Sequence, residues 1–406
     1  MKQEIIDKIN QLASQDEPFL FVINYQGDKA FIRLLSDINP EECLFDFEGR
    51  GNFSHAWKET VEKETVEKET LKKETLKEET LKKETLKEEI PEIIWQIEPP
   101  LYKDYERSFG IVKSNIMGGN SYLTNLTCKI PVNSNLSLEE IFHRAKGKYK
   151  LLLRKKRTQA ENKAHLKEEE AQNKAHLKEE EEEQNKAHLK EEEQNKAYLK
   201  EENKEENLKP FVCFSPETFI RIKGRRIYSY PMKGTLDASL PDAEKQLMED
   251  RKEAAEHATI VDLIRNDLSR VAEDVRVDKY RYIDVLHTNK GDILQTSSEI
   301  SGRLPEDYPH HLGEILDAQL PAGSITGAPK DKTMQIIQEA EGYDRGFYTG
   351  IMGIYDQGEL NSAVMIRFIE EEEANKMYFK AGGGITSKSD CQREYEEVIQ
   401  KIYLPF

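Results

Sequence analysis

Short apolar or alternating stretches, each bounded by turn residues, recur along the chain and predict β-strands. The run FLFVIN at 19–24 is typical of them. The predicted strands cover residues 19–24, 93–97, 122–130, 211–214, 218–222, 226–229, 282–288, 293–300, 350–356, 359–369 and 376–381. Strands that follow one another so directly indicate antiparallel neighbours.

Apolar positions three and four residues apart predict helices between these strands. The expected helices lie near residues 102–117, 138–153, 242–266, 328–341 and 390–402, after a first helix at the N-terminus. Ser137 followed by Glu140 has the spacing of a capping box and marks one helix start. Helices mixed with antiparallel strands favour an α+β fold.

Two charged repeat blocks interrupt this pattern. A KET(V/L)x pentapeptide fills residues 57–90, and an NKA(H/Y)LKEEE repeat fills residues 158–207. A five-residue step does not return to one helix face, and the second repeat offers little apolar surface to bury. We interpret both as solvated insertions, with a spacer or partner-binding role as the alternative. The remaining stretches, 1–56, 91–157 and 208–406, have ordinary globular composition.

Charge and cysteine content narrow the possible functions. The 406 residues carry a formal net charge of −17, which disfavours a nucleic-acid surface because phosphate contacts need clustered Lys and Arg. The four cysteines have no zinc or disulfide spacing, so we expect free thiols. Neither a signal peptide nor a run of about 18 apolar residues occurs, and we expect a cytoplasmic protein.

Four carboxylates have helical spacing that suits a metal. Glu253 and Glu256 lie three residues apart on one predicted helix, and Glu394 and Glu397 do so on another, with Lys401 one turn further on. If the two pairs face each other, Mg²⁺ between them would relieve their repulsion, because it prefers oxygen ligands. Such pairs are also common on solvated helix faces.

Glycine-rich segments and one lysine provide further candidates. The segments PAGSITGAPK (321–330) and AGGGIT (381–386) would let the backbone bind an anion, or would be tight packing turns. In PMKGT, Lys233 lies between a proline turn and a glycine; desolvated, its amine would be a nucleophile, and otherwise it is a surface residue. Glu217 precedes it by a strand-turn-strand distance and would meet it across a hairpin as a general acid and base.

Eight motifs in this order resemble those of the chorismate-utilising enzymes. They are SPETF, PMKGT, EHATIVDLIRND, PAGSITGAPK, YTGIMGIY, MIRF, GGGI and CQREYEEV, all within residues 208–406. The resemblance implies an anthranilate synthase component I-like α+β fold, a two-layer β-sheet sandwich flanked by helices, with residues 208–406 as the catalytic core. Residues 1–56 and 91–157 would be a reduced N-terminal part of the same fold.

Within that family the chain is most similar to aminodeoxychorismate synthase component I, chiefly because of Lys233. Anthranilate synthases typically have alanine there. The resemblance implies Mg²⁺-dependent amination of chorismate to 4-amino-4-deoxychorismate for para-aminobenzoate and folate biosynthesis. The Lys233 amine would add at C2 as the C4 hydroxyl leaves, and ammonia would then enter at C4 and expel the lysine. Glu217 would protonate the hydroxyl.

The resemblance also implies the remaining roles. Glu256 and Glu397 would hold Mg²⁺ directly, with help from Glu253 and Glu394. The residues implied to bind chorismate are Thr235, Ser324, Tyr348, Arg367, Gly382, Gly383, Gly384 and Lys401. Tyr348 and Arg367 would clamp the enolpyruvyl carboxylate.

Two positions depart from the family pattern. Gln295 aligns where many relatives have histidine, and Lys388 aligns where an aspartate is usual. An anthranilate synthase component I and a non-catalytic partner-binding scaffold remain as alternatives. The sequence shows no Cys-His-Glu amidotransferase module, so a separate glutaminase subunit is expected to supply ammonia.

Overall fold

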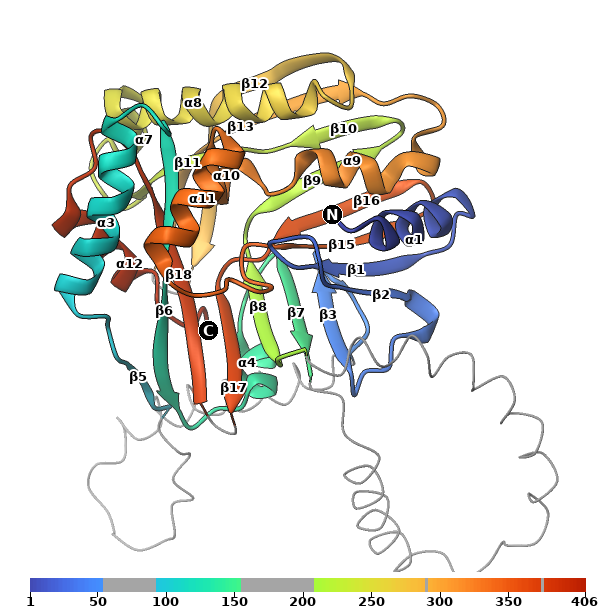
Figure 1. Cartoon of the computed structure of the whole chain (residues 1–406), viewed down its shortest axis with the longest axis horizontal. Coiled ribbons are helices and arrows are strands. Elements are labelled where there is room, and N and C mark those ends of the chain that lie inside the picture. The colour runs from blue at the N-terminus through green and yellow to red at the C-terminus, as the bar shows by residue number, and fades with distance from the viewer. Residues whose placement is uncertain (54–92, 155–207, 289–290, 374–375) are drawn as a thin grey trace, which may run out of the picture.

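The computed structural model describes residues 1–53, 93–154, 208–288, 291–373 and 376–406. Two antiparallel β-sheets form the centre of the molecule, and helices cover their outer faces (Figure 1). The two repeat blocks predicted at 57–90 and 158–207 lie outside the described residues. Within the described part, no helix is long and apolar enough to cross a membrane.

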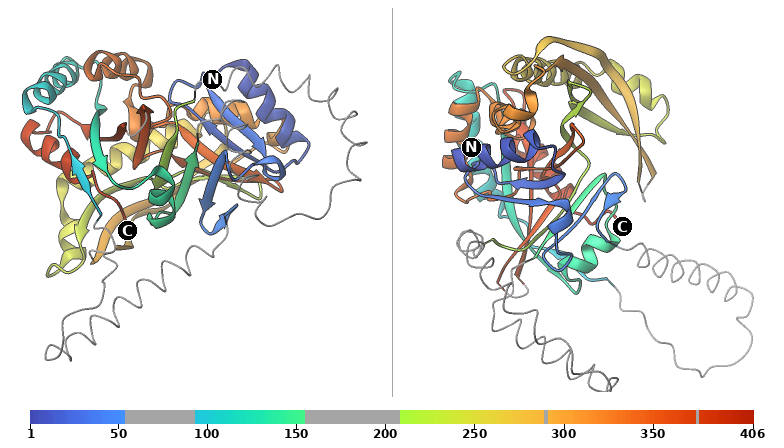
Figure 2. Two further views of the ribbon diagram at one scale, coloured as in Figure 1. Left: turned by 90° about the horizontal axis from the view of Figure 1, so that it is seen from below. Right: turned by 90° about the vertical axis from the view of Figure 1, so that its right-hand side faces the viewer.

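The first sheet has the strand order β11-β13-β10-β9-β16-β15-β1-β2, and β12 pairs with β13 beside this path. The long β12–β13 ribbon stands at one edge of the molecule, next to helix α8 (Figure 2). Its strands are β1 (Phe19–Ile23), β2 (Ala30–Leu34), β9 (Thr218–Lys223), β10 (Arg226–Ser229), β11 (Met232–Asp237), β12 (Glu273–Thr288), β13 (Gly291–Arg303), β15 (Ile351–Asp356) and β16 (Glu359–Val364).

The second sheet has the order β14-β6-β18-β17-β8-β7-β3-β4, with β5 paired to β6. Every recorded strand pair in both sheets is antiparallel, as the sequence pattern predicted. Its strands are β3 (Cys43–Phe47), β4 (Arg50–Gly51), β5 (Trp95–Ile97), β6 (Leu123–Ser134), β7 (Tyr149–Leu153), β8 (Phe211–Ser215), β14 (Gly327–Ala328), β17 (Phe368–Glu373) and β18 (Lys376–Ile385).

Helices cover the two sheets. Helices α1 and α9 pack over the first sheet, α8 lies along its β11, β12 and β13 strands, and α3, α4, α11 and α12 pack over the second sheet. The helices are α1 (Gln3–Ser14), η1 (Leu35–Asp37), α3 (Tyr102–Met117), α4 (Leu138–Arg144), α7 (Ala243–Glu249), α8 (Arg251–Leu268), η2 (Tyr308–His311), α9 (Leu312–Gln319), α10 (Gly323–Thr326), α11 (Lys330–Glu341) and α12 (Cys391–Gln400).

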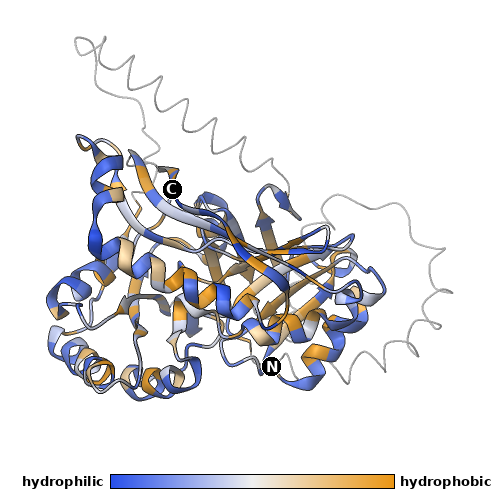
Figure 3. Cartoon of the chain, turned by 90° about the horizontal axis from the view of Figure 1, so that it is seen from above, coloured by the Kyte–Doolittle hydropathy of each residue, from blue (hydrophilic) through white to orange (hydrophobic). Residues whose placement is uncertain are grey.

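Strand β1 is apolar throughout because both of its faces are buried. Phe19, Phe21 and Ile23 belong to the core beneath α1 and α9, whereas Leu20 and Val22 belong to the core between the sheets. Alternate side chains of a strand point to opposite faces, so a strand covered on both sides must be apolar throughout. Figure 3 shows the apolar residues concentrated on such inner strands, while the helices mix apolar and polar residues.

The three globular stretches of the sequence build one interleaved structure. Strand β1, near the N-terminus, pairs with β15 of the C-terminal stretch. In the second sheet β7 lies between β3 and β8, so all three stretches meet in neighbouring strands. Residues 1–53 and 93–154 therefore complete the same two sheets as residues 208–406.

Three predicted elements are wrong in detail. The helix expected at 138–153 ends at Arg144, and Tyr149–Leu153 is the buried strand β7. The helix expected at 242–266 is interrupted at Asp250, whose side chain accepts hydrogen bonds from two backbone N–H groups and caps α8. The strand expected at 359–369 is two strands, β16 and β17, on different sheets. In each case long-range pairing or a local cap overrides the periodicity.

The close pairing of β14 with β6 gives a test of the fold. A Cβ at Gly327 would lie 1.8 Å from the carbonyl oxygen of Leu123, and its φ is +125°. We expect Gly327→Ala to lower the free energy of unfolding by more than about 2 kcal/mol, since neither the space nor the backbone conformation suits alanine. Urea denaturation followed by circular dichroism measures this loss.

Gly110 provides the matched control. It lies within α3, is exposed, and has open space around the position of an added Cβ. Gly110→Ala should raise the free energy of unfolding by about 0.5–1 kcal/mol, because alanine loses less backbone entropy in a helix. Equal effects of the two substitutions would contradict the close approach of β14 to β6.

Candidate active site

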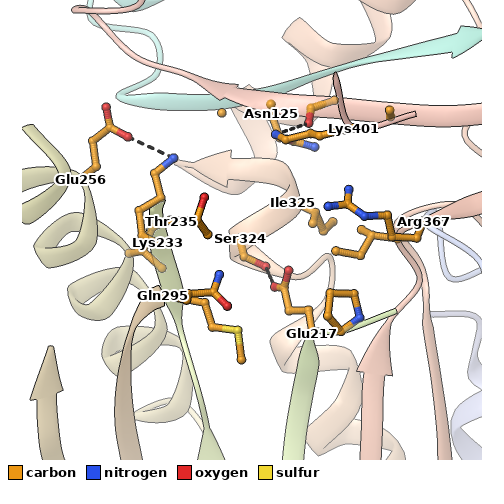
Figure 4. Close-up of a pocket in the computed structure, with 18 of the residues that line it drawn as sticks. Asn125, Glu217, Lys233, Thr235, Glu256, Gln295, Ser324, Ile325, Arg367 and Lys401 are labelled. Atoms are coloured by element: carbon orange, nitrogen blue, oxygen red, sulfur yellow. Dashed lines mark hydrogen bonds and ion pairs between the residues drawn. The ribbon is translucent and has the colours of Figure 1, made fainter. Parts of the chain in front are cut away.

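A cleft of about 830 Å³ opens between one end of each sheet. Strands β11 and β13 with helix α8 form one wall, and β6, β18 and the C-terminal residues form the other (Figure 4). This volume lies within the usual range for a small-molecule site.

Most of the sequence-predicted site residues line this cleft. They are Glu217, Lys233, Thr235, Glu256, Ser324, Tyr348, Arg367, Gly382, Gly383, Gly384 and Lys401. Glu253, Glu394 and Glu397 are not among the lining residues, but Glu253 lies near Gly234, and Glu394 and Glu397 lie near Gly383. Gln295 and Lys388, the two departures from the family pattern, line it as well. Residues far apart in sequence therefore meet in one place.

A bulge in strand β11 presents Lys233 to the cleft. The register between β11 and β13 shifts between Met232 and Thr235, and Gly234 there has φ +81°. A bulge of this kind redirects a side chain, and a positive φ favours glycine. The backbone carbonyl of Lys233 accepts a hydrogen bond from the hydroxyl of Thr296. The PMKGT segment is thus a bulged strand.

The amine of Lys233 forms an ion pair with Glu256. Nζ lies 3.0 Å from Oε2 of Glu256, while the amine of Lys252 lies 3.6 Å from the other oxygen. Burial lowers the pKa of Lys233, but the charge and hydrogen bond of Glu256, with Glu253 and Glu397 further off, outweigh it and raise the pKa. A raised pKa favours the ammonium form in this structure, whereas the sequence analysis considered a neutral amine as the nucleophile.

Glu217 lies between β8 and β9 and accepts a hydrogen bond from the hydroxyl of Ser324, with 2.6 Å between the oxygens. Burial raises the pKa of Glu217, although Ser324 and the charge of Arg367 oppose this shift. A raised pKa favours the protonated carboxyl, which suits a proton donor.

Glu217 and Lys233 do not meet across a hairpin, contrary to the prediction. Strand β11 pairs with β13 and not with β9, so no hairpin joins the two residues. In Figure 4 the Lys233 amine points toward Glu256 and away from Glu217. A molecule bound in the cleft would lie between the two groups.

The three glycines form part of strand β18, at the point where its second neighbour ends. Strand β6 pairs with β18 along Gly382–Gly384, whereas β17 pairs with it only as far as Lys380. The other edge of the glycine segment therefore borders the cleft. A Cβ at Gly382 would lie 2.5 Å from the carbonyl oxygen of Leu126, so close packing against β6 also requires glycine there.

Helix α12 brings two carboxylates and Lys401 to the same glycines. Lys401 lies 2.8 Å from Oε1 of Glu397 and donates to the carbonyl of Gly382 at 3.0 Å. Burial raises the pKa of Glu394. For Glu397, the raising effect of burial is outweighed by Lys401, and its pKa is lowered. A Cβ at Gly383 would lie within 4.0 Å of both carboxylates.

The carboxylates of α8 and α12 converge without forming a ready metal site. Lys233 interacts electrostatically with Glu253 and Glu256 from α8 and with Glu397 from α12. In the part of the chain that the structure describes, no three His, Cys, Asp or Glu side chains lie close enough to hold a metal. The donors are nevertheless all carboxylate oxygens, the chemistry that Mg²⁺ prefers, so the residue types fit this ion.

Positive charge dominates the lining of the cleft. Against the two acidic residues Glu217 and Glu256, the basic lining residues are Lys146, Lys148, Lys233, Lys252, Arg367, Lys380, Lys388 and Lys401. In a chain of net charge −17, basic side chains thus outnumber acidic ones in the lining of this one concave site, although several of them pair with carboxylates. The cleft therefore suits an anionic small molecule.

His257 supports one wall of the cleft without lining it, and the sequence analysis missed it. It follows Glu256 on α8, is fully buried, and its Nε2 lies 2.7 Å from the hydroxyl of Ser298. Burial and the charge of Arg281 lower its pKa to about 4, so the ring is neutral. Ser298 in turn donates its backbone N–H to Pro231, and His257 thereby links α8 to the strand that carries Lys233. Its position directly after Glu256, at the start of the EHATIVDLIRND motif, could have drawn attention to it.

Comparison with known proteins now identifies the family to which this cleft corresponds. A family model described as chorismate binding enzyme matches residues 202–405. A Haemophilus influenzae protein named as an uncharacterized PabA-like protein is 40% identical over 403 residues, 99% of this chain and 97% of that protein. An anthranilate synthase component 1 of Haloarcula marismortui is 37% identical over 198 residues, 47% of this chain and 39% of that protein.

A solved structure supports the fold. The 2,3-dihydroxybenzoate-specific isochorismate synthase of Bacillus anthracis superposes with a TM-score of 0.60 at 19% identity, covering 98% of this chain and 86% of that one. At this identity the likeness concerns the fold alone. It confirms the predicted α+β architecture of two sheets flanked by helices.

The charge state of Lys233 is directly testable. Folding raises its pKa, so the Lys233–Glu256 pair stabilises the fold below the ordinary lysine pKa, and this contribution is lost as the pH rises through the higher folded value. We expect Glu256→Gln to lower the pKa of Lys233, because burial then acts with less opposing charge. Titration of ¹³C-methylated lysines by NMR measures it.

The control for this titration is Glu244→Gln, on the exposed face of α7. This change should leave the Lys233 resonance unmoved. A Lys233 pKa that is the same in wild type and Glu256→Gln would contradict the ion pair.

Proposed function

This chain belongs to the family of chorismate binding enzymes, and on that premise we propose that it is aminodeoxychorismate synthase component I. The enzyme would convert chorismate and ammonia to 4-amino-4-deoxychorismate, for para-aminobenzoate and folate biosynthesis. The observation that carries this proposal is a lysine amine, Lys233, presented by a strand bulge into the cationic cleft. The PabA-like name of the Haemophilus influenzae relative is in keeping with a para-aminobenzoate enzyme.

Lys233 is the feature that separates this activity from anthranilate synthesis within the family. A lysine amine that loses its proton is a good nucleophile, whereas the alanine typical of anthranilate synthases has no such group. Direct replacement of a ring hydroxyl by ammonia is difficult. Two successive displacements through an enzyme amine divide the barrier into two smaller ones and return nitrogen to the carbon that lost oxygen.

In the first displacement the neutral Lys233 amine adds at C2 of chorismate. The ring double bonds shift, and the C4 hydroxyl leaves as water with the proton of Glu217. In the second, ammonia adds at C4, the double bonds shift back, and the C2–nitrogen bond to Lys233 breaks. Glu217 then takes the proton that the new ammonium group releases, which restores both groups.

This sequence requires the Lys233 amine to leave Glu256 and turn toward the ring. Its side chain is long and has several rotatable bonds, and it would have to break its ion pair with Glu256 to reach the ring. Because its pKa is raised, the carboxyl of Glu217 would carry the proton that the departing hydroxyl needs. Since the amine and this carboxyl point to different parts of the cleft, the ring would lie between them.

Mg²⁺ is proposed as the cofactor, with Glu256 and Glu397 as its direct ligands and Glu253 and Glu394 in support. When bound, the ion would neutralise the ring carboxylate of chorismate and the charge of Glu256. If the charge of Glu256 were partly neutralised, burial would then lower the pKa of Lys233 with less opposition. Burial raises the pKa of both Glu394 and Glu253. Beside a cation, these two carboxyls would ionise more fully.

The remaining lining residues would bind the substrate. Arg367 and Tyr348 would hold the enolpyruvyl carboxylate, and Lys401 would face the ring carboxylate. Thr235 and Ser324 would contribute hydroxyl groups, and Gly382–Gly384 their backbone N–H groups. Ammonia would come from a separate glutamine amidotransferase subunit.

Turnover with Lys233→Ala is the decisive test. Purified protein is incubated with chorismate, MgCl₂ and an ammonium salt, and products are identified by mass spectrometry. We expect wild type to form a product that retains the enolpyruvyl group, and Lys233→Ala to lose this activity by roughly a thousandfold or more, because the nucleophile is gone.

Lys252→Ala is the matched control, since this lysine contacts the same carboxylate of Glu256 from α8. Because its ion pair with Glu256 is partly exposed, Lys252→Ala should lower the activity less than about tenfold. Fluorescent anthranilate with released pyruvate would instead identify an anthranilate synthase. Chorismate left unchanged by wild type would favour a non-catalytic scaffold.

Metal dependence has its own test. We expect a chelator to abolish amination and Mg²⁺ to restore it, and Glu256→Gln or Glu397→Gln to raise the Mg²⁺ dissociation constant at least about tenfold. Calorimetric titration of the protein with Mg²⁺ measures binding independently of activity. Glu396→Gln, next to Glu397 on α12 but hydrogen-bonded to Gln392 instead of Lys401, should bind Mg²⁺ as wild type does. Full activity with excess chelator would refute the metal site.

A further inference from the structure

Arg367 occupies a strained position between β16 and β17. Its φ is +55°, in the left-handed region that residues other than glycine rarely adopt. Such strain persists where the surrounding structure imposes it, and it is most common at functional sites. In Figure 4 the Arg367 side chain lies among the residues that line the cleft, on the same side as Glu217.

The guanidinium of Arg367 has an aromatic partner instead of a carboxylate. Its Cζ lies 5.3 Å from the centroid of the Tyr403 ring, and Tyr403 also lines the cleft. Among the described residues this guanidinium forms no ion pair or side-chain hydrogen bond, although its charge lowers the pKa of the nearby Glu217. An aromatic face attracts the cation but uses none of its N–H donors.

This arrangement differs from that of the neighbouring cations. Lys233 and Lys401 each pair with a carboxylate, so a substrate carboxylate would have to compete with Glu256 or Glu397 for them. Arg367 instead keeps its donors available for a bidentate pair.

The C-terminal residues that carry Tyr403 are held in place across the cleft edge. The backbone N–H of Lys146 donates to the carbonyl of Pro405 at 2.6 Å. Leu404 and Phe406 pack against the core beneath α3, α11 and α12. Tyr403 therefore lies on a fixed segment between α12 and this anchor, and its ring is a fixed surface for the guanidinium.

We propose that Tyr403 is a positioning residue, whose ring holds the guanidinium of Arg367 ready for a carboxylate of the substrate. The role rests on the proposed function, since it concerns the affinity of the same cleft for chorismate. An arginine side chain has several rotatable bonds, and ordering it on binding costs affinity. The ring of Tyr403 removes part of that cost in advance.

The experiment compares Tyr403→Leu with Tyr403→Phe in steady-state amination of chorismate. We expect Tyr403→Leu to raise KM for chorismate about 2-fold to 30-fold, the range of a cation–π interaction, with kcat within about twofold of wild type. Tyr403→Phe, which keeps the ring and removes the hydroxyl, should stay near the wild-type KM. A Tyr403→Phe variant as impaired as Tyr403→Leu would overturn the proposal.

A double-mutant cycle separates positioning from a merely structural effect. In the Arg367→Ala background, Tyr403→Leu should raise KM no further, because the group that it positions is already absent. Additive effects on KM would overturn the proposal. Should Tyr403→Leu fail to fold in thermal denaturation, Tyr403→Met replaces it in the same cycle, with the same expected results.

Failure of this inference is distinguishable from failure of the proposed function. Wild type that aminates chorismate while Tyr403→Leu has an unchanged KM would refute the role of Tyr403 alone. Calorimetric binding of chorismate to wild type, Tyr403→Leu and Tyr403→Phe, without ammonia, tests the same affinity change without turnover. If chorismate binds but is not aminated, this measurement still decides the role of Tyr403.

Discussion

Packing between the two sheets is the constraint on which the rest of this structure depends. Side chains from β1, β2 and β15 of the first sheet meet those from β3, β7 and β8 of the second in one buried core. These strands lie at one end of each sheet order. At the other end, β11 and β13 face β6 and β18 across the cleft. The site is thus the region that the sheets leave open beyond their shared core.

Because strands from opposite ends of the chain pair within both sheets, the walls of the cleft are fixed by long-range contacts. Strand β11 and helix α8 form part of the first wall. Strand β18 and Lys401, at the end of α12, form part of the second. Their catalytic candidates, Lys233 with Glu256 and Lys401 with Glu397, form similar ion pairs on the two walls. Lys233 and Lys401 thus pair with Glu256 and Glu397, the same two carboxylates that would bind the proposed Mg²⁺.

The same cleft holds its cations in two different ways. Carboxylates hold Lys233, Lys380 and Lys401, the last two with a backbone carbonyl as well, whereas an aromatic ring holds Arg367. Each way leaves a different amount of positive charge for a ligand, because a carboxylate neutralises the cation and a ring does not. This explains how a chain of strongly negative net charge presents a site suited to an anion.

Periodicity and caps were enough for the sequence to predict the α+β class, the bounds of α3 and the position of many strands, and the order of motifs selected a group of residues of which most line the cleft. These features depend on neighbours a few residues away. Tertiary structure alone decided that 149–153 is a central strand, that Lys233 lies on a bulge and pairs with Glu256, and that Tyr403 lies beside Arg367. Strand pairing, charge state and ring contacts depend on groups distant in sequence, and local patterns carry no information about which distant groups will meet.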